Sequence, residues 1–138
     1  MDKALNYLAL ARKARLIEAG EEPVGAAARA LHARLIVVAS DASDHTWRRA
    51  KSFAAGTSQQ VLRVPFTKDE MGFALGRQEL AIAAFTDAAL AASFVKALPE
   101  PQKYGAVAEA LEVKVQRQRQ RQKEAKAHEK NVRKGKKK

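Results

Sequence analysis

The sequence predicts an α/β fold, a three-layer α/β/α sandwich with a basic C-terminal tail that is helical or disordered. Apolar, β-branched runs alternate with segments of helical periodicity along the first 98 residues. Such alternation implies a sheet covered by helices on both faces. The charge then changes: residues 1–98 carry 13 Lys and Arg against 10 Asp and Glu, whereas residues 99–138 carry 13 against 5. We therefore assign a domain to residues 1–98, expected to fold without the rest, and a tail to residues 99–138.

In the first half of this domain, two helices alternate with two strands. Leu5 and Leu8 fit one face of an amphipathic helix, and "RLIEAG" (15–20) follows as a brief strand. Pro23 fits the first turn of a second helix, which continues to about residue 32, because proline there loses no needed hydrogen bond. The unbroken apolar run "RLIVVAS" (34–40) is typical of a strand buried on both faces.

The middle of the domain predicts a helix, a strand and a short helix. The helix runs through "HTWRRAKSFAA" (45–55), and the strand is "QQVLRVPF" (59–66). Thr67 and Glu70 have the spacing of a capping box, so a short helix begins there and finishes at Gly76.

The last strand and helix of the domain come before two prolines. "LAIAAF" (80–85) is interpreted as another buried strand, and Thr86 is the predicted cap of the helix "DAALAASFVKAL" (87–98). Pro99 and Pro101 end that helix and, by this interpretation, the domain.

The tail contains helix formers throughout its first part, and we predict a helix over about 106–128 followed by disorder. Val107, Leu111 and Val115 recur every four residues, so the first turns could rest on a partner surface. Beyond Val115 the tail is polar on every side and cannot bury itself.

The composition excludes several classes of function. A formal charge of +11 indicates nucleic acid or an anionic membrane surface as a partner. After Val115 the tail lacks the Trp, Phe and Leu that a membrane-lying helix needs, which favours RNA or DNA. There is no cysteine, the three histidines lack ligand spacing, and no apolar run reaches membrane-spanning length. We expect a cytoplasmic protein, monomeric when free, with no metal, cofactor or membrane partner.

No motif in the chain predicts catalysis. "SDASDH" (40–45) contains Ser, Asp and His, but these residues favour a turn with a helix cap, and a catalytic triad is recognised by geometry rather than composition. Neither a P-loop nor a dinucleotide-binding glycine motif is present. Trp47, beside two arginines, could stack on a base; a half-buried place on its helix is the favoured interpretation.

Glu21 and Glu22 stand at the entrance to the second helix and allow two interpretations. Carboxylates at a helix N-terminus are stabilised by its unpaired N–H groups, whatever the function. Alternatively, a carboxylate at a helix tip accepts hydrogen bonds from guanine edges in an RNA groove. Such a groove must be distorted, because regular A-form RNA hides its major groove from side chains.

The order "GEEPVGAAARA", "VVASDAS", "VPFTKDEMGFALGR" and "LAIAAF" resembles the ribosomal protein family that binds kink-turn RNA, which includes an archaeal large-subunit protein and bacterial YlxQ-type paralogues. The resemblance covers about residues 3–98 and implies a four-stranded mixed sheet between helices. It also implies that the helix tip and the loop after Gly76 hold kinked RNA, with Glu22 in the guanine-reading position. The predicted RNA-binding residues are Lys13, Gly20, Glu21, Glu22, Arg29, Arg77, Gln78, Glu79, Arg117, Arg119 and Arg121.

The three arginines of "QRQRQRQ" (116–122) complete the predicted interface. In a helix Arg117 and Arg121 share a face and Arg119 points elsewhere, whereas an extended chain aligns all three. The sequence thus predicts a non-enzymatic RNA-binding protein, whose partner is ribosomal RNA or another kink-turn RNA, with ribosomal proteins as further candidate partners. The alternative is a protein-interaction module whose tail alone contacts RNA, and pairing of helix 106–115 with another protein would favour it.

Overall fold

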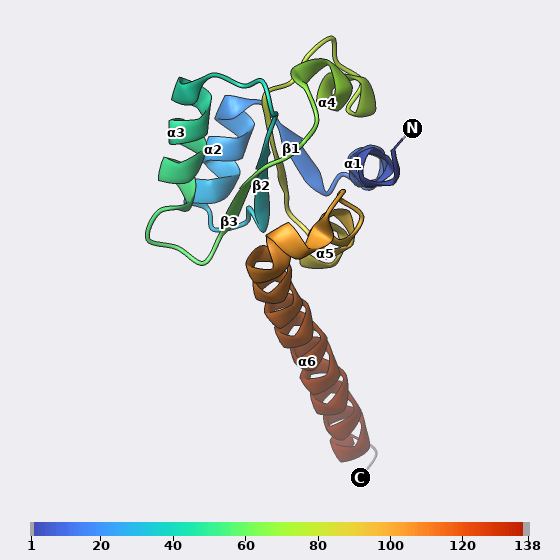
Figure 1. Cartoon of the computed structure of the whole chain (residues 1–138). Helices are drawn as coiled ribbons and strands as arrows, with labels where there is room; N and C mark the ends of the chain where they lie inside the picture. The colour runs from blue at the N-terminus through green and yellow to red at the C-terminus, as the bar shows by residue number, and fades with distance from the viewer. Residues whose placement is uncertain (1, 137–138) are drawn as a thin grey trace.

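A computed structural model of the chain describes residues 2–136 (Figure 1). Helices and strands alternate along the body, and one long helix leaves it (Figure 1). In chain order the elements are α1 (Lys3–Ala14), β1 (Ile17–Ala19), α2 (Glu21–Arg29), β2 (Leu35–Val38), α3 (Asp44–Ala54), β3 (Gln60–Arg63), α4 (Lys68–Ala74), β4 (Ile82–Phe85), α5 (Ala88–Lys96), the 3₁₀ turn η1 (Pro101–Tyr104) and α6 (Gly105–Lys136).

The four strands form one mixed sheet in the order β1-β4-β2-β3. β2 pairs with β3 in parallel, and β4 is antiparallel to both β2 and β1. The two central strands, β2 and β4, are buried at every position, as their unbroken apolar runs predict. The predicted four-stranded mixed sheet is confirmed.

The sheet separates two apolar cores. Because side chains alternate along a strand, Ile36 and Val38 face α2 and α3, whereas Leu35 and Val37 face α1, α4 and α5. Within the second core, the rings of Phe85 and Phe94 contact each other in a tilted arrangement, with 5.1 Å between their centroids. The predicted three-layer sandwich is therefore confirmed.

Local capping fixes where most helices begin. The predicted capping box is present: the Thr67 hydroxyl accepts from the Glu70 N–H, and the Glu70 carboxylate accepts from the Thr67 N–H. The prediction that Thr86 caps α5 is wrong, because the Asp87 carboxylate accepts the Leu90 N–H at 2.9 Å. Thr86 is still held by the sheet, since its N–H donates to the carbonyl of Leu16.

The buried core continues beyond the predicted domain end. Leu111 is fully buried in the core that contains Phe94 and Leu98, and Val115 is also buried. The surface on which these apolar positions rest is this chain's own α5, with an ion pair between Lys96 and Glu112 joining the two helices.

Helix α6 extends from Gly105 to Lys136, further than the helix predicted over about 106–128, and the disorder expected after it stays a prediction; Lys137 and Lys138 lie outside the described residues. From Gln116 to Lys130 every residue of α6 is exposed, as a segment that is polar on all sides must be. Among the described residues, no helix combines the length and apolar character that crossing a membrane requires.

Candidate nucleic-acid interface

The turn from β1 into α2 sets the position of the helix tip. Gly20, the N-cap residue, has φ of +98°, a conformation that residues with a Cβ rarely adopt. Its N–H donates to the carbonyl of Ile82 at 3.0 Å, which holds the tip against the first residue of β4. Glu21 and Glu22 form the first turn of α2, where unpaired N–H groups stabilise carboxylates.

The two glutamates have different surroundings. The Glu21 Oε1 lies 2.5 Å from Nε of Arg49 on α3, so this carboxylate is occupied by a partner within the chain. Glu22 is exposed and, among the residues the structure describes, has no hydrogen-bond or ion-pair partner. Of the pair, Glu22 is the carboxylate available to a ligand.

The loop after Gly76 is held tightly although its side chains are exposed. The Arg77 N–H donates to the Gly72 carbonyl at 2.7 Å, and the buried Leu80 donates to the Lys68 carbonyl at 3.0 Å. A Cβ atom at Gly72 would lie 2.7 Å from Cα of Glu79, so only glycine allows this close approach. The side chains of 77–79, three of the predicted RNA-binding residues, therefore project from a fixed backbone.

The structure brings the helix tip and this loop together. A Cβ atom at Gly20 would lie 3.6 Å from Nη1 of Arg77. Beside them, between the end of α1 and the loop, is a hollow of about 440 Å³ whose lining includes Arg12, Arg15 and Arg77, together with Glu18. This basic hollow flanks an acidic helix tip, so the surface combines cationic donors, which suit phosphates, with a carboxylate acceptor.

Arg12 and Arg15 were not among the predicted site residues. Arg15 has φ of +60°, which ends α1 in the left-handed conformation, and the Arg12 guanidinium occupies the space beside Gly76 where a Cβ would be. Their i, i+3 spacing was the available signal, but a helical spacing does not show which loop the face meets.

Other predicted residues do not join this cluster. Lys13 is exposed next to it and does not line the hollow. Arg29 is at the opposite end of α2, where its Nη1 would lie 3.3 Å from a Cβ at Gly25. Arg117 and Arg121 line a different cavity, while Arg119 does not, as expected for a helix.

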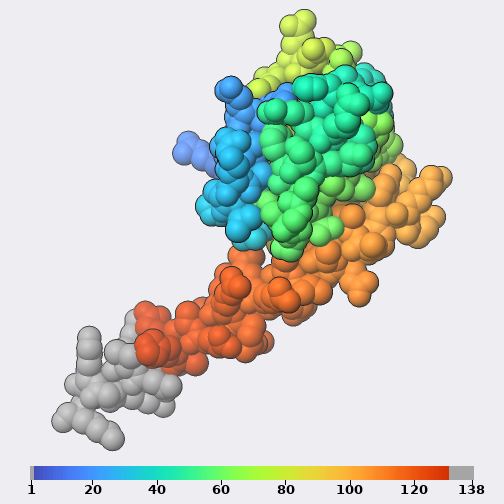
Figure 2. Space-filling model, turned by 90° about the vertical axis from the view of Figure 1, so that its left-hand side faces the viewer, coloured from blue at the N-terminus to red at the C-terminus, as the bar shows by residue number. Residues whose placement is uncertain are grey.

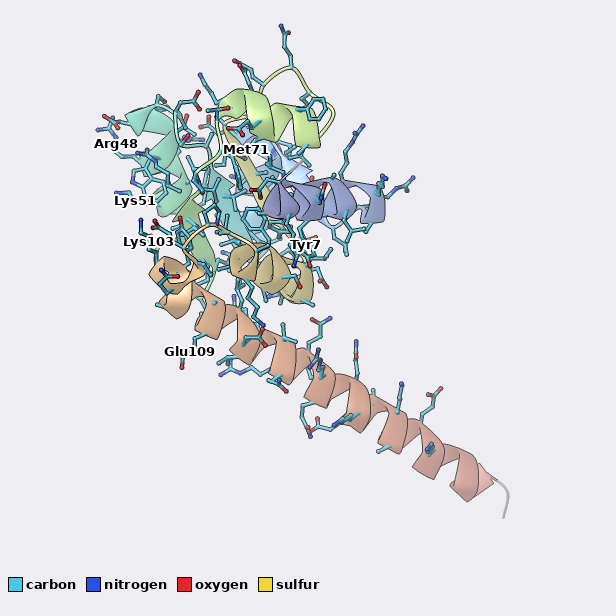
Figure 3. The ribbon with its side chains drawn as sticks, turned by 45° about the vertical axis from the view of Figure 1, so that its right-hand side comes forward. Tyr7, Arg48, Lys51, Met71, Lys103 and Glu109 are labelled. Carbon is cyan, nitrogen blue, oxygen red and sulfur yellow. The ribbon has the colours of Figure 1, made fainter. Side chains whose placement is uncertain are left out.

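The face of α2 and α3 is visible in Figure 2, with the loop after α4 above it and α6 leaving below. Arg48 and Lys51 extend outward from α3 (Figure 3). Trp47 is half-buried on α3, as predicted, and the Arg63 guanidinium carbon lies 5.0 Å from its ring centroid. Ser43 caps α3 by accepting the Thr46 N–H, so the polar run 40–45 provides a turn and a cap.

The described residues contain no group of three or more His, Asp or Glu side chains arranged to hold a metal ion. The helix 106–115, whose pairing with another protein would favour a protein-interaction module, packs instead on α5 of the same chain through Leu111. Its buried positions are therefore not offered to a partner.

No protein-family model matches the sequence, and no curated protein matches it significantly. Among solved structures, a protein of unknown function from Bacillus halodurans is similar, with a TM-score of 0.65 and 27% identity. The similarity covers 70% of this chain and 97% of that one, so part of this chain has no counterpart there. A Giardia lamblia 15.5 kD RNA-binding protein has a TM-score of 0.59 and 16% identity, over 75% of this chain and 85% of its own. These likenesses support the fold, whereas membership of the kink-turn family stays a prediction.

Proposed function

We propose that the chain is a non-enzymatic RNA-binding protein that recognises kinked RNA through the α2 tip and the loop after Gly76. The observation that carries this proposal is the meeting of Gly20 and Arg77 at a basic hollow, which is lined in part by Pro23, the residue after the exposed Glu22. The RNA-binding description of the Giardia lamblia neighbour supports RNA as the class of partner. The resemblance of 3–98 to kink-turn proteins supports the finer assignment.

Each part of the surface has a distinct role in this proposal. Arg12, Arg15 and Arg77 contact phosphates and so position the RNA without reading its sequence. Glu22 accepts hydrogen bonds from guanine N1–H and amino groups, which are free only where pairing is not Watson–Crick. Glu21 orients the tip through Arg49 rather than contacting RNA. The exposed part of α6 adds affinity that does not depend on sequence.

The decisive experiment compares Glu22→Gln with Glu109→Gln on two RNAs, a kink-turn duplex and a straight duplex. Both variants remove one negative charge from an exposed side chain, and Glu109 extends from α6, away from the tip (Figure 3). If charge alone matters, both variants should bind RNA as tightly as the unmodified chain or more tightly. We expect Glu22→Gln to lose about 1–3 kcal/mol of binding to the kinked RNA, the scale of a good base contact, and Glu109→Gln to lose none.

Thermal unfolding of both variants checks the folding, since a lost helix-dipole interaction costs only about 0.3–1 kcal/mol of stability. Equal binding of kinked RNA by Glu22→Gln and Glu109→Gln would reduce Glu22 to a helix-stabilising residue and contradict the proposed recognition.

The contribution of the distal tail is tested by a chain of residues 1–122, which keeps Leu111 and Val115. Residues 123–138 hold eight Lys and Arg against two Glu. Their removal should flatten the plot of log affinity against log salt by about 2–5 units if three to six of the charges contact phosphate. Preference for kinked over straight RNA should remain, and its loss would assign the recognition to the tail.

A further inference from the structure

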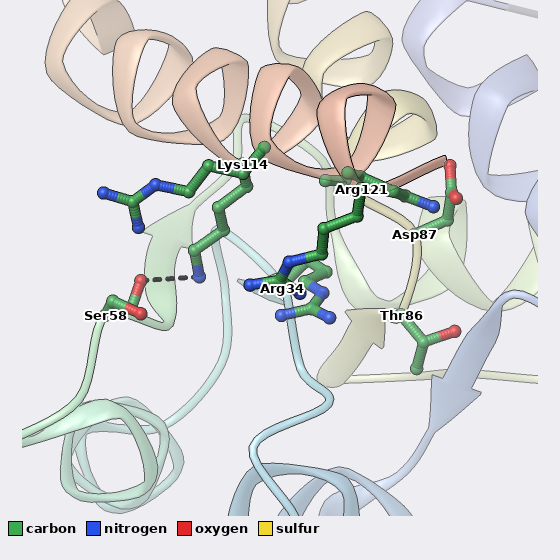
Figure 4. Close-up of a pocket in the computed structure, with 9 residues that line it drawn as sticks. Arg34, Ser58, Thr86, Asp87, Lys114 and Arg121 are labelled. Carbon is green, nitrogen blue, oxygen red and sulfur yellow. Dashed lines mark hydrogen bonds between the residues drawn. The ribbon is translucent and has the colours of Figure 1, made fainter. Parts of the chain in front are cut away.

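A second cavity, of about 420 Å³, lies where α6 crosses the end of the sheet (Figure 4). Its lining includes four cationic side chains, Arg34, Lys114, Arg117 and Arg121, and one carboxylate, Asp87. This end is opposite the helix tip, because Gly20 is bonded to the first residue of β4 whereas Asp87 follows its last by two positions. The cavity is therefore separate from the proposed recognition surface.

The backbone around the cavity is fixed by hydrogen bonds. The Arg34 N–H donates to the Phe85 carbonyl at 2.7 Å, which ties this residue to the end of β4. The buried Gln59 accepts the neighbouring Ala33 N–H at 3.0 Å and so holds the start of β3 against the same segment. Arg34 therefore lies directly before β2 in a segment that hydrogen bonds tie to both β4 and the start of β3.

Helix α6 supplies the other three cations from one face. Lys114, Arg117 and Arg121 follow the i, i+3, i+7 pattern of residues that lie above one another on a helix. Lys114 Nζ donates to the Ser58 carbonyl at 2.8 Å, and in Figure 4 Lys114 and Arg121 reach from α6 toward Arg34. The burial of Leu111 and Val115 fixes which face of α6 meets the sheet.

This arrangement leaves positive charge without compensation. In the part of the chain whose side chains are described, none of the four cations has an ion-pair partner. The Asp87 carboxylate, the one negative group in the lining, already accepts the Leu90 N–H as the cap of α5. Burial, followed by the proximity of Arg34 and Arg117, lowers the pKa of Lys114. Four converging cations are unfavourable for an empty cavity and favourable for one that holds an anion.

We propose that Arg34, Lys114, Arg117 and Arg121 form a phosphate-binding site at the base of the sheet. Guanidinium groups present planar pairs of N–H donors that match the oxygens of a phosphate, and the lysine adds a point charge. The phosphate is either a free phosphate or a phosphodiester of bound RNA. The second source rests on the proposed RNA binding, whereas the first does not.

The first arm of the test uses inorganic phosphate and the full chain. Thermal unfolding is followed as phosphate replaces chloride at constant ionic strength, because a ligand that binds the folded state raises its melting temperature. We expect a rise of several degrees for the unmodified chain, and none for Arg34→Gln or Arg121→Gln. Arg48→Gln is the matched control, since it removes one positive charge from α3, outside the cavity.

The second arm measures RNA binding by the same variants. If the source is RNA, Arg34→Gln and Arg121→Gln weaken binding to kinked and straight duplexes by a similar factor. Each also lowers the slope of log affinity against log salt by about one, whereas Arg48→Gln has a smaller effect on both. A free-phosphate site is identified if phosphate raises the melting temperature of the unmodified chain but not of the cavity variants, and these variants show no specific loss of RNA affinity. The proposal is overturned if phosphate stabilises no more than chloride and the three variants bind RNA alike. Both arms can still be interpreted if Glu22 proves not to discriminate kinked from straight RNA, because neither arm depends on a kink.

Discussion

Replacing Leu111 by alanine tests whether the first turns of α6 belong to the folded body in solution. Leu111 is fully buried and lies in the same core as Phe94 and Leu98. The substitution removes three buried carbon groups, worth about 2.4 kcal/mol at about 0.8 kcal/mol each. A cavity that does not collapse raises the loss to at most about 5 kcal/mol.

Urea unfolding measures this loss directly. With a dependence of about 1–3 kcal/mol per molar urea, a loss of about 2.4 kcal/mol lowers the midpoint by about 0.8–2.4 M, and a larger loss lowers it further. Val113→Ala is the matched control on the same helix, because Val113 is 44% exposed and its truncation should change stability by less than about 0.5 kcal/mol. Equal midpoints for the two variants would refute the packing of α6 on α5.

The burial of Leu111 against α5 also affects the stability of shortened chains. The sequence predicted that residues 1–98 fold alone, but removal of α6 uncovers the apolar face of α5 on which Leu111 packs. We expect residues 1–122 to unfold cooperatively near the midpoint of the full chain, and residues 1–98 to unfold at a clearly lower one.

Three further changes probe the loop, the α5 cap and the phosphate cavity. Gly72→Ala should destabilise the fold by about 1–3 kcal/mol, as overpacking does. Gly105→Ala should be neutral or stabilising, because a Cβ atom there meets nothing within 4 Å. Equal urea midpoints for the two variants would contradict this. Asp87→Ala should cost about 1 kcal/mol as a lost helix cap, and Thr86→Ala should cost less by the same measurement. For Lys114, the lowered pKa means that the unfolded chain binds more protons, so its charge penalises folding at neutral pH. The penalty fades as pH rises through the lowered pKa and is gone above the ordinary value of 10.5. In phosphate-free buffer Lys114→Gln should therefore melt higher than the unmodified chain at pH 7, with an advantage that shrinks toward pH 10.5; a constant advantage would exclude the pKa as its cause.

At the candidate interface, the contacts between segments distant in sequence could not be predicted. The glutamate pair was recognised, but its two members were indistinguishable until α3 brought Arg49 to Glu21. Arg12 and Arg15 were visible only as charges near the end of a helix, and their role depends on the position of Gly76 far along the chain. Arg34 gave no signal, because the three cations it faces are about 80 residues away in sequence.

The sequence by itself determined the strands, the three-layer arrangement and the capping box of α4. These depend on periodicity and on hydrogen bonds between residues three or four positions apart, which are present in the order of residues. Only the tertiary structure decided that Leu111 is core, that Gly20 meets Arg77, and that α6 lays its cations over Arg34. The physical reason is that an apolar or basic helix face has the same periodicity whichever surface it meets, so its partner is chosen by packing between segments distant in sequence.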